Sequence, residues 1–275
     1  MRRILLFFAV TLSVSTGGLS GQKVLNDTPH ILEDLYSRLL ISHSDSVRLQ
    51  MNDSIKLLIE SYVSSDTVFQ SNFKNLRYLG QITSPDSSLK IITWNLILPE
   101  SPGRYFCYFI RKGSPGKTNK IYRMSALYKV NPVTADTSYA QADWYGALYY
   151  DVRPCTINNK TCWILLGIDY GNPDISRKII DVLTISADDS LVFGRKWFES
   201  KGKNKFRAVF EYASDGMMSL RFKSDSSIVF DHLVPFSESQ RNDHQFYGPD
   251  YSNDAYNYSN GVWRLVINVD ARNNK

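Results

Sequence analysis

The sequence predicts a mainly β protein of the α+β class, with an N-terminal helical hairpin packed on a large, twisted antiparallel β-meander of about 12 strands. Three observations predict this class. Aromatic residues, which favour strands, are abundant, with 17 Tyr, 14 Phe and 5 Trp among 275 residues. Two stretches with apolar residues at helical spacing fall within residues 28–63. From residue 76 onward, short apolar runs are separated by turn signals with no helix between them, as in antiparallel neighbours.

The first 21 residues are predicted to be a secretory signal peptide. A basic start, Met1-Arg2-Arg3, precedes an apolar run over 4–14 and small residues over 15–21. The apolar run is about half of the ~20 residues that a membrane-spanning helix needs, so cleavage after Ser20 is favoured over an uncleaved anchor. No cysteine lies near this junction for lipid attachment, and no later apolar run is long enough for a transmembrane helix. We therefore expect an exported protein of the periplasm or the outer cell surface.

Residues 22–75 form the predicted helical segment. Thr28 and Pro29 suit a helix start, with Thr as the N-cap and Pro at the first helical position. Two apolar stripes at helical spacing follow, broken at 42–44: Ile31, Leu32, Leu35, Tyr36, Leu39 and Leu40, then Val47, Met51, Ile55, Leu58, Ile59 and Tyr62. Two amphipathic helices with a short link form a hairpin whose apolar side must cover something. One face of the following sheet is the simplest candidate.

Residues 76–275 form the predicted antiparallel β domain. Its expected strands lie near 76–83, 89–98, 104–111, 120–128, 144–153, 160–168, 177–186, 191–198, 205–213, 217–223, 227–233 and 261–269. Residues 162–168 and 178–185 are apolar on both faces, which favours a packed core over a polar lumen. The longest links are 129–143 and 234–260, and long links in compact domains are often functional.

The side-chain alternation over 205–223 predicts a hairpin with a fixed register. A three-residue loop ending at Gly216 pairs Tyr212 with Met218 and Phe210 with Leu220, which keeps the apolar side chains on one face. A two-residue turn would mix the two faces. The favoured register places Gly216 at a left-handed bulge position, where glycine has no steric penalty.

Two of the three cysteines face each other in a second predicted hairpin. Asn158 and Asn159 favour positive φ and form a two-residue turn, which sets Cys155 opposite Cys162. An oxidising compartment permits a disulfide there, and two reduced, packed thiols fit the sequence equally well. Cys107 lies in an aromatic run and is expected to be a small buried hydrophobe.

The C-terminal stretch carries the most chemistry. Two Asp-His pairs and two further aspartates give six candidate metal or acid–base residues: Asp231, His232, Asp243, His244, Asp250 and Asp254. Their spacing matches no calcium loop, because the glycine and the terminal glutamate are missing. A long loop also needs polar groups to satisfy its own backbone, so a structural role is the main alternative.

Aromatic residues in the same stretch give a second kind of candidate site. The candidate ligand-binding residues are Tyr247, Asp250, Tyr251, Tyr256 and Trp263, because aromatic faces stack on sugars and peptides. The chain has no Gly-x-Ser-x-Gly, His-Glu-x-x-His or Cys-x-x-Cys motif, so no catalytic residue is assigned. No cofactor is expected other than a divalent metal at the Asp/His cluster.

Several short runs of the β domain occur together in one family. They are Ser84-Pro85-Asp86, Thr93-Trp94-Asn95, residues 144–150, Leu165-Leu166-Gly167, residues 177–183, residues 229–233, residues 246–250 and residues 269–273. With these runs, the chain resembles an uncharacterised family of exported proteins from Gram-negative anaerobic bacteria, over roughly residues 76–273. That family has no assigned activity. The resemblance therefore implies export and a β architecture, and it gives no residue a role.

The leading functional hypothesis is an exported envelope or surface protein of non-enzymatic, binding or structural type, whose partner is an envelope protein or a glycan. The first alternative is a metal-assisted or acid–base hydrolase that uses the C-terminal Asp/His cluster, and the second is an outer-membrane β-barrel. A formal net charge of +5 is too small to indicate a nucleic-acid groove, so no nucleic-acid partner is expected. The sequence does not determine the oligomeric state.

Overall fold

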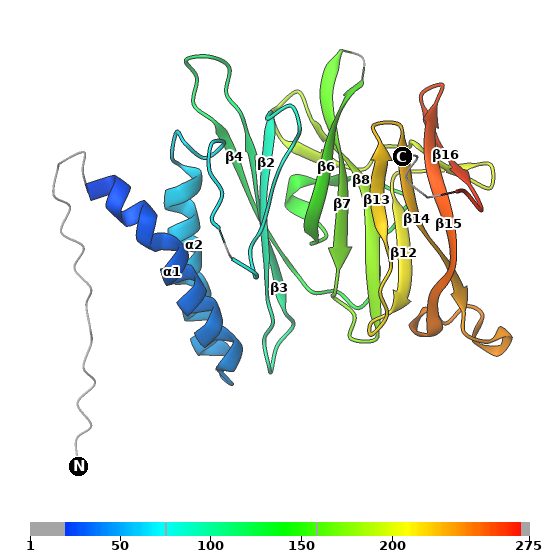
Figure 1. The fold of residues 1–275 in the computed structure, drawn as a ribbon, viewed down its shortest axis with the longest axis horizontal. Coiled ribbons are helices and arrows are strands. Elements are labelled where there is room, and N and C mark those ends of the chain that lie inside the picture. Colours follow the sequence, from blue (N-terminus) through cyan, green and yellow to red (C-terminus); the bar gives the residue numbers. More distant parts are fainter. Residues whose placement is uncertain (1–19, 75, 158, 271–275) are drawn as a thin grey trace.

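The structure, a computed structural model, describes residues 20–74, 76–157 and 159–270. Nearly all of the predicted signal peptide lies outside these described residues. The described part of the chain is mainly β. Two N-terminal helices pack on antiparallel sheets, which confirms the predicted fold class (Figure 1). No helix among the described residues is long and apolar enough to span a membrane.

The strands form three sheets, which we name A, B and C. Sheet A contains, in order, β1 (Gly80–Thr83), β2 (Leu89–Leu96), β3 (Arg104–Arg111) and β4 (Lys120–Leu127). Sheet B contains, in order, β5 (Tyr139–Ala140), β9 (Leu191–Phe193), β8 (Ile175–Ile185), β7 (Lys160–Asp169) and β6 (Leu148–Ile157), with β12 (Ala208–Ala213) also paired to β8. Sheet C contains, in order, β11 (Lys203–Lys205), β10 (Phe198–Ser200), β16 (Val262–Val266), β15 (Tyr247–Ser259), β14 (Ser227–Pro235) and β13 (Leu220–Ser224). Neighbours are antiparallel except β10 and β16, which run parallel.

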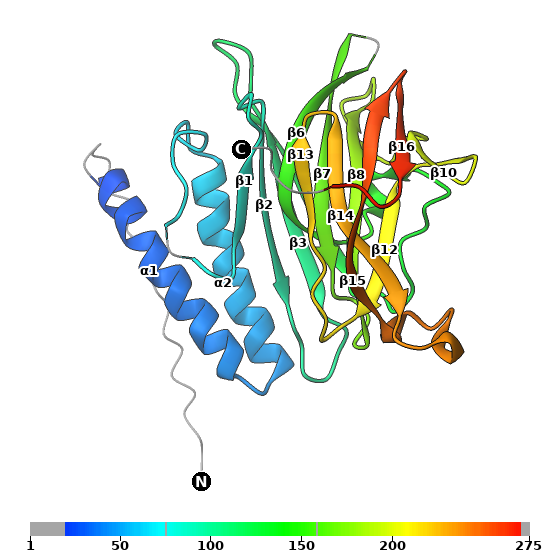
Figure 2. The ribbon, with the colours of Figure 1, turned by 45° about the vertical axis from the view of Figure 1, so that its right-hand side comes forward.

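The helices and the three sheets are stacked as four layers, with the helices outermost on one side and sheet C on the other (Figure 2). Three separate apolar cores hold these layers together, one at each interface. Short 3-10 helices lie in the connections: η1 (Gln141–Asp143), η2 (Glu238–Gln240) and η3 (His244–Phe246). The order of layers means that sheets A and B are each covered on both faces.

The helical hairpin consists of α1 (Ser20–Ile41) and α2 (Asp45–Val63). The predicted break at 42–44 is confirmed, whereas the predicted start at Thr28 is wrong, because α1 continues through Pro29. A proline removes one backbone hydrogen bond and disfavours a helix interior. Here Leu32 and Tyr36 of α1 are buried in the core between the helices and sheet A. This packing stabilises the helix and outweighs the helix-breaking tendency of Pro29.

Side-chain alternation divides sheet A between two cores. In β3, Phe106, Tyr108 and Ile110 face the helices. Cys107 and Phe109 face sheet B, as successive residues of a strand point to opposite faces. Cys107 is fully buried with a free thiol, as predicted.

Sheet B is buried on both faces, which confirms the interpretation of residues 162–168 and 178–185 as packed strands. Its β7 and β8 contribute to the core with sheet A through Trp163, Leu165, Ile179 and Leu183. The intervening residues contribute to the core with sheet C: Cys162, Ile164, Leu166, Ile180 and Val182. Both strands therefore place apolar side chains on both of their faces, as strands between two layers must.

The hairpin of β6 and β7 has the predicted register, with Cys155 opposite Cys162 and Thr156 opposite Thr161. The two cysteines form a disulfide, with their Cα atoms 4.9 Å apart. The structure thus decides between the oxidised pair and the two packed thiols that the sequence left open.

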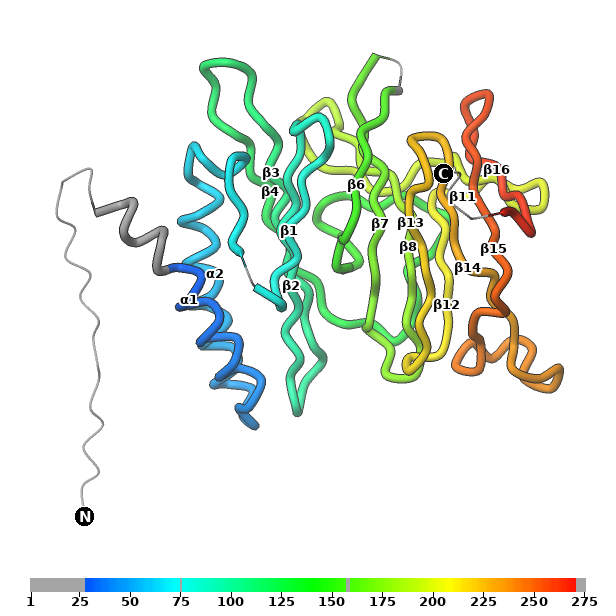
Figure 3. The backbone as a smooth tube through the Cα atoms, viewed as in Figure 1, coloured from blue at the N-terminus to red at the C-terminus, as the bar shows by residue number. Residues whose placement is uncertain are grey.

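The predicted hairpin over 205–223 is not formed. β12 pairs with β8, with Tyr212 opposite Ser176, and β13 pairs with β14, with Leu220 opposite Phe230. The two strands lie in different sheets, and the chain turns from one sheet to the other between them (Figure 3). Gly216 accordingly does not adopt the left-handed conformation expected of it. The two strands pair with other partners instead of with each other, which the local side-chain alternation does not reveal.

The predicted link 234–260 is mostly strand. β15 occupies Tyr247–Ser259 and pairs with β14 on one side and with β16 on the other. Its composition is polar because part of it lies on the outer face of the outermost sheet, so the apolar signal of a strand is weak.

Candidate functional site

The structure separates the predicted ligand-binding residues. Tyr256 and Trp263 lie in the core between sheets B and C, and Trp263 is only 1% exposed, so neither ring is free to stack on a ligand. Tyr251 has a positive φ of 70° and is 99% exposed. Tyr247 packs edge-on against the His244 ring, with centroids 4.8 Å apart. Asp250 is exposed and accepts hydrogen bonds from its own turn.

The six predicted metal residues do not gather at one point. Among the described residues, no three His, Cys, Asp or Glu side chains form a set that could hold a metal ion. Asp231, Asp243 and Asp250 each accept hydrogen bonds from nearby backbone or side-chain groups. Asp243 and Asp250 therefore stabilise local turns, and Asp231 joins β14 to the residue before β13.

Asp231, His232, Asp254 and Tyr256 line one hollow, and His232 and Asp254 are the pair among them that a hydrogen bond joins. His232 Nδ1 lies 2.7 Å from Asp254 Oδ2, and the other oxygen of Asp254 accepts the backbone N–H of Asn268 at 3.0 Å. The pair lines a hollow of about 370 Å³ at the mouth between sheets B and C. The buried carboxylate fixes the half-exposed imidazole through Nδ1 and leaves Nε2 open, an arrangement that can accept or give a proton.

His244 belongs to a different cluster, which the sequence did not indicate. Its Nδ1 lies 2.8 Å from Oε2 of Glu211 on β12. Glu211 Oε1 accepts a hydrogen bond from Arg177 Nε at 2.8 Å, and Arg177 Nη1 donates to Asp169 Oδ2 at 3.1 Å. Arg177 is only 1% exposed. The four side chains form one hydrogen-bonded chain from the inside of sheet B to η3.

This Arg177 network also holds backbone segments. Arg177 donates to the carbonyl oxygens of Lys129 and Val130, in the loop after β4. Asp169 accepts hydrogen bonds from the Tyr105 hydroxyl at 2.9 Å and from the Gly171 N–H at 2.7 Å. The network therefore ties together β3, the loop after β4, the turn after β7, the strand β12 and the segment η3.

The ionisation of Glu211 follows from its neighbours. Burial alone raises the pKa of this carboxyl, but the hydrogen bonds and charges of Arg177 and His244 outweigh burial and bring its pKa below the ordinary value. Glu211 is thus ionised at neutral pH and supplies a full counter-charge to Arg177.

The loops fixed by this network expose apolar side chains at one end of the molecule, the lower end in Figure 1. We call the following five residues the apolar end: Leu127, Val130, Tyr170, Met217 and Phe236. Hydrogen bonds link the loops that carry Val130, Tyr170 and Met217, from Asn172 Nδ2 to Val130 O at 3.2 Å and from Ser214 N to Asp174 O at 3.0 Å. Met217 is the most exposed of the five, at 88%.

The turns at the opposite ends of the same strands are polar. Four of them cover 84–88, 112–119, 186–190 and 224–227. None of the large exposed hydrophobic residues in the described part of the chain lies in these turns. Single exposed apolar residues are common on any surface, whereas here five of them lie at one end of the molecule.

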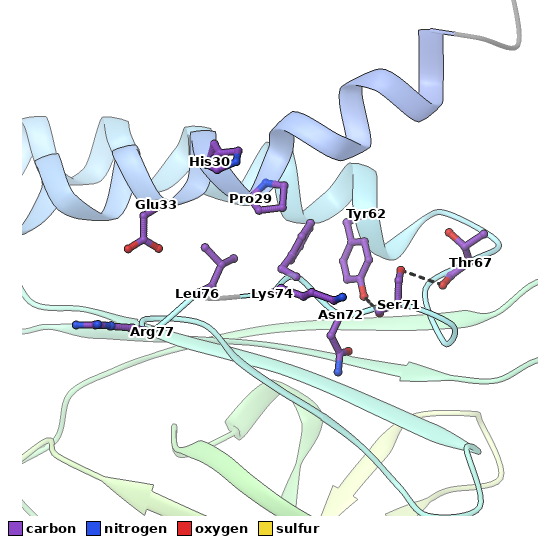
Figure 4. A pocket seen from close by; sticks show the side chains of 11 residues that line it. Pro29, His30, Glu33, Tyr62, Thr67, Ser71, Asn72, Lys74, Leu76 and Arg77 are labelled. Atoms are coloured by element: carbon purple, nitrogen blue, oxygen red, sulfur yellow. Dashed lines mark hydrogen bonds between the residues drawn. The ribbon is translucent and has the colours of Figure 1, made fainter.

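A cleft lies between α1 and the segment that follows α2 (Figure 4). Its volume is about 880 Å³. Pro29, His30 and Glu33 on α1 face Leu76 and Arg77 across it. The remaining lining residues are Tyr62, Thr67, Ser71, Asn72, Phe73 and Lys74. Sequence patterns gave no signal for this cleft, because its walls come from two elements of which one is irregular.

Lys90 lies beneath this cleft and is only 1% exposed. Its Nζ donates to the Tyr62 hydroxyl at 2.5 Å and to the carbonyl oxygens of Val68 and Ser71, each at 2.6 Å. Burial lowers the pKa of Lys90 to about 8. All three ammonium protons are satisfied by uncharged oxygens, so this amine anchors the segment 64–74 to sheet A.

Comparison of the chain with protein-family models, with curated proteins and with solved structures finds no match.

Proposed function

We propose that this chain is an exported protein of the cell envelope or surface that acts by binding, without catalysis, and that it contacts a protein partner through the apolar end. The observation that carries the proposal is the Arg177 network beneath these exposed side chains. Burying a guanidinium and two carboxylates is unfavourable unless each is paired. Here the pairing fixes several separate loops in one arrangement, which lowers the entropy that a partner must overcome on binding.

The chemistry of the apolar end favours a protein partner over a glycan. Four of its five side chains, Leu127, Val130, Met217 and Phe236, carry no hydrogen-bonding side-chain group other than the weak thioether sulfur. Protein interfaces are enriched in Met and aromatic residues at their buried centres. A glycan would need more donors and acceptors than these side chains offer.

Two observations support export. The N-terminal residues have the composition of a signal peptide. The disulfide between Cys155 and Cys162 belongs in an oxidising compartment. The resemblance to exported proteins of Gram-negative anaerobes agrees with the same compartment.

The proposal is tested by site-specific photo-crosslinking in the producing cell. A photoreactive phenylalanine analogue replaces Met217 or Phe236 in one pair of variants, and Leu57 or Lys117 in the control pair. Leu57 is exposed on α2 and Lys117 lies in an opposite turn. We expect one discrete crosslinked protein from both apolar-end positions and none from the controls.

The partner identified in this way is then purified and its affinity measured. Met217→Ser with Phe236→Ser should weaken binding at least tenfold, because two exposed anchors are lost, whereas Leu57→Ser should leave the affinity unchanged. Equal crosslinking at all four positions, or unchanged affinity in the double variant, would refute the apolar end as the binding surface.

Acid–base catalysis at the His232–Asp254 pair is the second candidate function. It is favoured by one observation, the carboxylate-fixed imidazole that opens toward a hollow. Hydrolysis of p-nitrophenyl esters and glycosides by the leaderless protein tests it, with His232→Ala and Asp254→Asn as variants. A rate above background that falls at least a hundredfold in both variants supports catalysis, and a rate that persists in His232→Ala removes the candidate.

A further inference from the structure

We infer that the cleft between α1 and the described residues 64–74 and 76–77 is a second binding site, and that its ligand is a short acidic peptide segment of a partner. The cleft is separate from the apolar end in both position and chemistry. Its volume of about 880 Å³ lies in the range of roughly 300–1,000 Å³ that is typical of ligand-binding clefts.

The charge of the cleft indicates an anionic ligand. Lys74 and Arg77 lie on one wall, and Glu33 is the only carboxylate among the described lining residues. Neither basic side chain makes a hydrogen bond or ion pair with any other described residue, and the same holds for Glu33 and His30. The arginine fork can bind a carboxylate through two parallel hydrogen bonds.

Lys90 adds a third positive charge under the floor of the cleft. Its ammonium donates only to the uncharged oxygens of Tyr62, Val68 and Ser71, so no carboxylate among the described residues neutralises it. Tyr62 and Ser71 are themselves lining residues, which places this buried charge one residue from the cleft. An anion in the cleft would be attracted to it through a low-dielectric layer.

The other lining groups favour a peptide over an acidic sugar. The aromatic rings of Tyr62 and Phe73 are buried, so no exposed ring is offered as a stacking platform. Asn72 has an amide free of hydrogen bonds to described residues, and such an amide can both donate to and accept from a peptide backbone. Pro29 and Leu76 supply a small apolar contact for a side chain between two acidic ones.

Fluorescence anisotropy on the leaderless protein tests this inference. The probe is a labelled octapeptide of alternating Glu and Leu, and its Gln-Leu counterpart is the control peptide. We expect the acidic peptide to bind at least tenfold more tightly than the neutral one. Lys74→Gln with Arg77→Gln should abolish that difference, and Glu33→Gln should tighten binding because the opposing charge is removed.

Lys117→Gln with Lys201→Gln is the matched control, since it removes the same charge from turns elsewhere on the surface and should leave the affinity unchanged. A second readout does not depend on affinity: the pKa of Lys90, followed by NMR of its ε-carbon, should rise when the acidic peptide binds. Absent binding, or equal loss in the control variant, overturns the inference. Tighter binding of oligogalacturonate with the same dependence on Lys74 and Arg77 also overturns it, in favour of an acidic glycan.

Discussion

At the scale of single residues, Arg177 shows how a charge can be kept inside this protein. Its guanidinium has two carboxylate partners, Asp169 and Glu211, and two backbone carbonyl partners, so most of its hydrogen-bonding capacity is used. Removing it would leave two carboxylates without their counter-charge in a buried place. Arg177 therefore contributes to stability mainly because it neutralises two carboxylates, Asp169 and Glu211.

Arg177→Met is expected to lower the free energy of unfolding by about 3–5 kcal/mol, the usual effect of breaking a buried ion pair from one side. Urea denaturation measures it. The control is Arg241→Met, which breaks the exposed pair with Glu238 and should change stability by less than about 1 kcal/mol. Similar effects of the two substitutions would show that Arg177 is not a buried anchor.

Lys90 makes the stability depend on pH in an unusual direction. Its pKa in the folded protein is about 8, below the ordinary value of 10.5, so the unfolded chain binds this proton more tightly. Stability contributed by Lys90 therefore rises as the pH increases from about 8 toward 10.5. The slope for one proton is at most about 1.4 kcal/mol per pH unit.

The measurement is urea denaturation of the wild type and of Lys90→Met between pH 7 and 9.5. The difference in unfolding free energy, wild type minus variant, should grow above pH 8. The series ends at pH 9.5 because of Tyr62, whose pKa burial raises to about 12. Above that pH this tyrosine ionises more readily in the unfolded chain than in the folded protein, which lowers stability. A difference that is constant with pH would show that Lys90 titrates normally.

At the scale of elements, turns differ in whether they need glycine. Gly146, just before β6, has a φ of +89°, and a Cβ there would lie 2.5 Å from the Cδ2 atom of the buried Tyr105 ring. Gly216, between β12 and β13, lacks a positive φ, and its nearest contact would be 3.2 Å from Ala213 O. The two glycines therefore differ in both conformation and available space.

Gly146→Ala should destabilise the protein by about 2–4 kcal/mol, since left-handed strain and overpacking add. Gly216→Ala should cost less than about 1 kcal/mol, as an ordinary surface change does. Thermal or urea unfolding of both variants compares them. The reverse ranking would restore the left-handed role that the sequence assigned to Gly216.

The β6–β7 hairpin is closed by its disulfide. The bridge spans a sequence separation of only 7 residues, so the entropy it removes from the unfolded chain is modest. We expect Cys155→Ala with Cys162→Ala to lower stability by about 2–3 kcal/mol. Reduction of the wild type with dithiothreitol should produce the same loss, and no change on reduction would mean that the bridge does not form in solution.

At the scale of the whole molecule, the four layers depend on each other. Sheet A presents Ile92, Trp94, Phe106 and Tyr108 to the helices, and all four are buried only because α1 and α2 cover them. The helical segment and the β domain predicted from the sequence therefore share a core.

A chain that contains only residues 76–275 should consequently aggregate, or fold only with residues 22–75 added as a separate peptide. Size-exclusion chromatography and circular dichroism of the fragment, alone and mixed with that peptide, provide the test. A soluble, folded fragment that melts like the intact protein would show that the β layers are independent of the helices.

The two ends of the stack also differ, and this difference concerns function. Polar turns close one end, while the other carries the apolar end above the Arg177 network. The cleft proposed to bind an acidic peptide lies to the side, between α1 and the segment that follows α2. The molecule thus offers two surfaces of opposite character, and one partner could contact both only if it were long enough to reach around the sheet.

Sequence by itself determined the features that depend on neighbours along the chain. The hairpin of α1 and α2, the register that sets Cys155 opposite Cys162, and the two-faced apolar strands of sheet B all follow from local periodicity and turn chemistry. Each of these features depends on side chains a few residues apart, so the sequence pattern is sufficient to predict it.

Tertiary structure alone decided which strands pair and which charges meet. β12 pairs with β8 rather than with β13, the strand that follows it. Glu211 forms hydrogen bonds with His244 and Arg177, and Lys90 donates a hydrogen bond to Tyr62. Of the six residues proposed as a metal cluster, Asp231, His232 and Asp254 line one hollow, and His232 and Asp254 are hydrogen-bonded to each other. The physical reason is that pairing between sheets and burial of charge depend on residues tens of positions apart, whose proximity is set by the stacking of layers rather than by any local pattern.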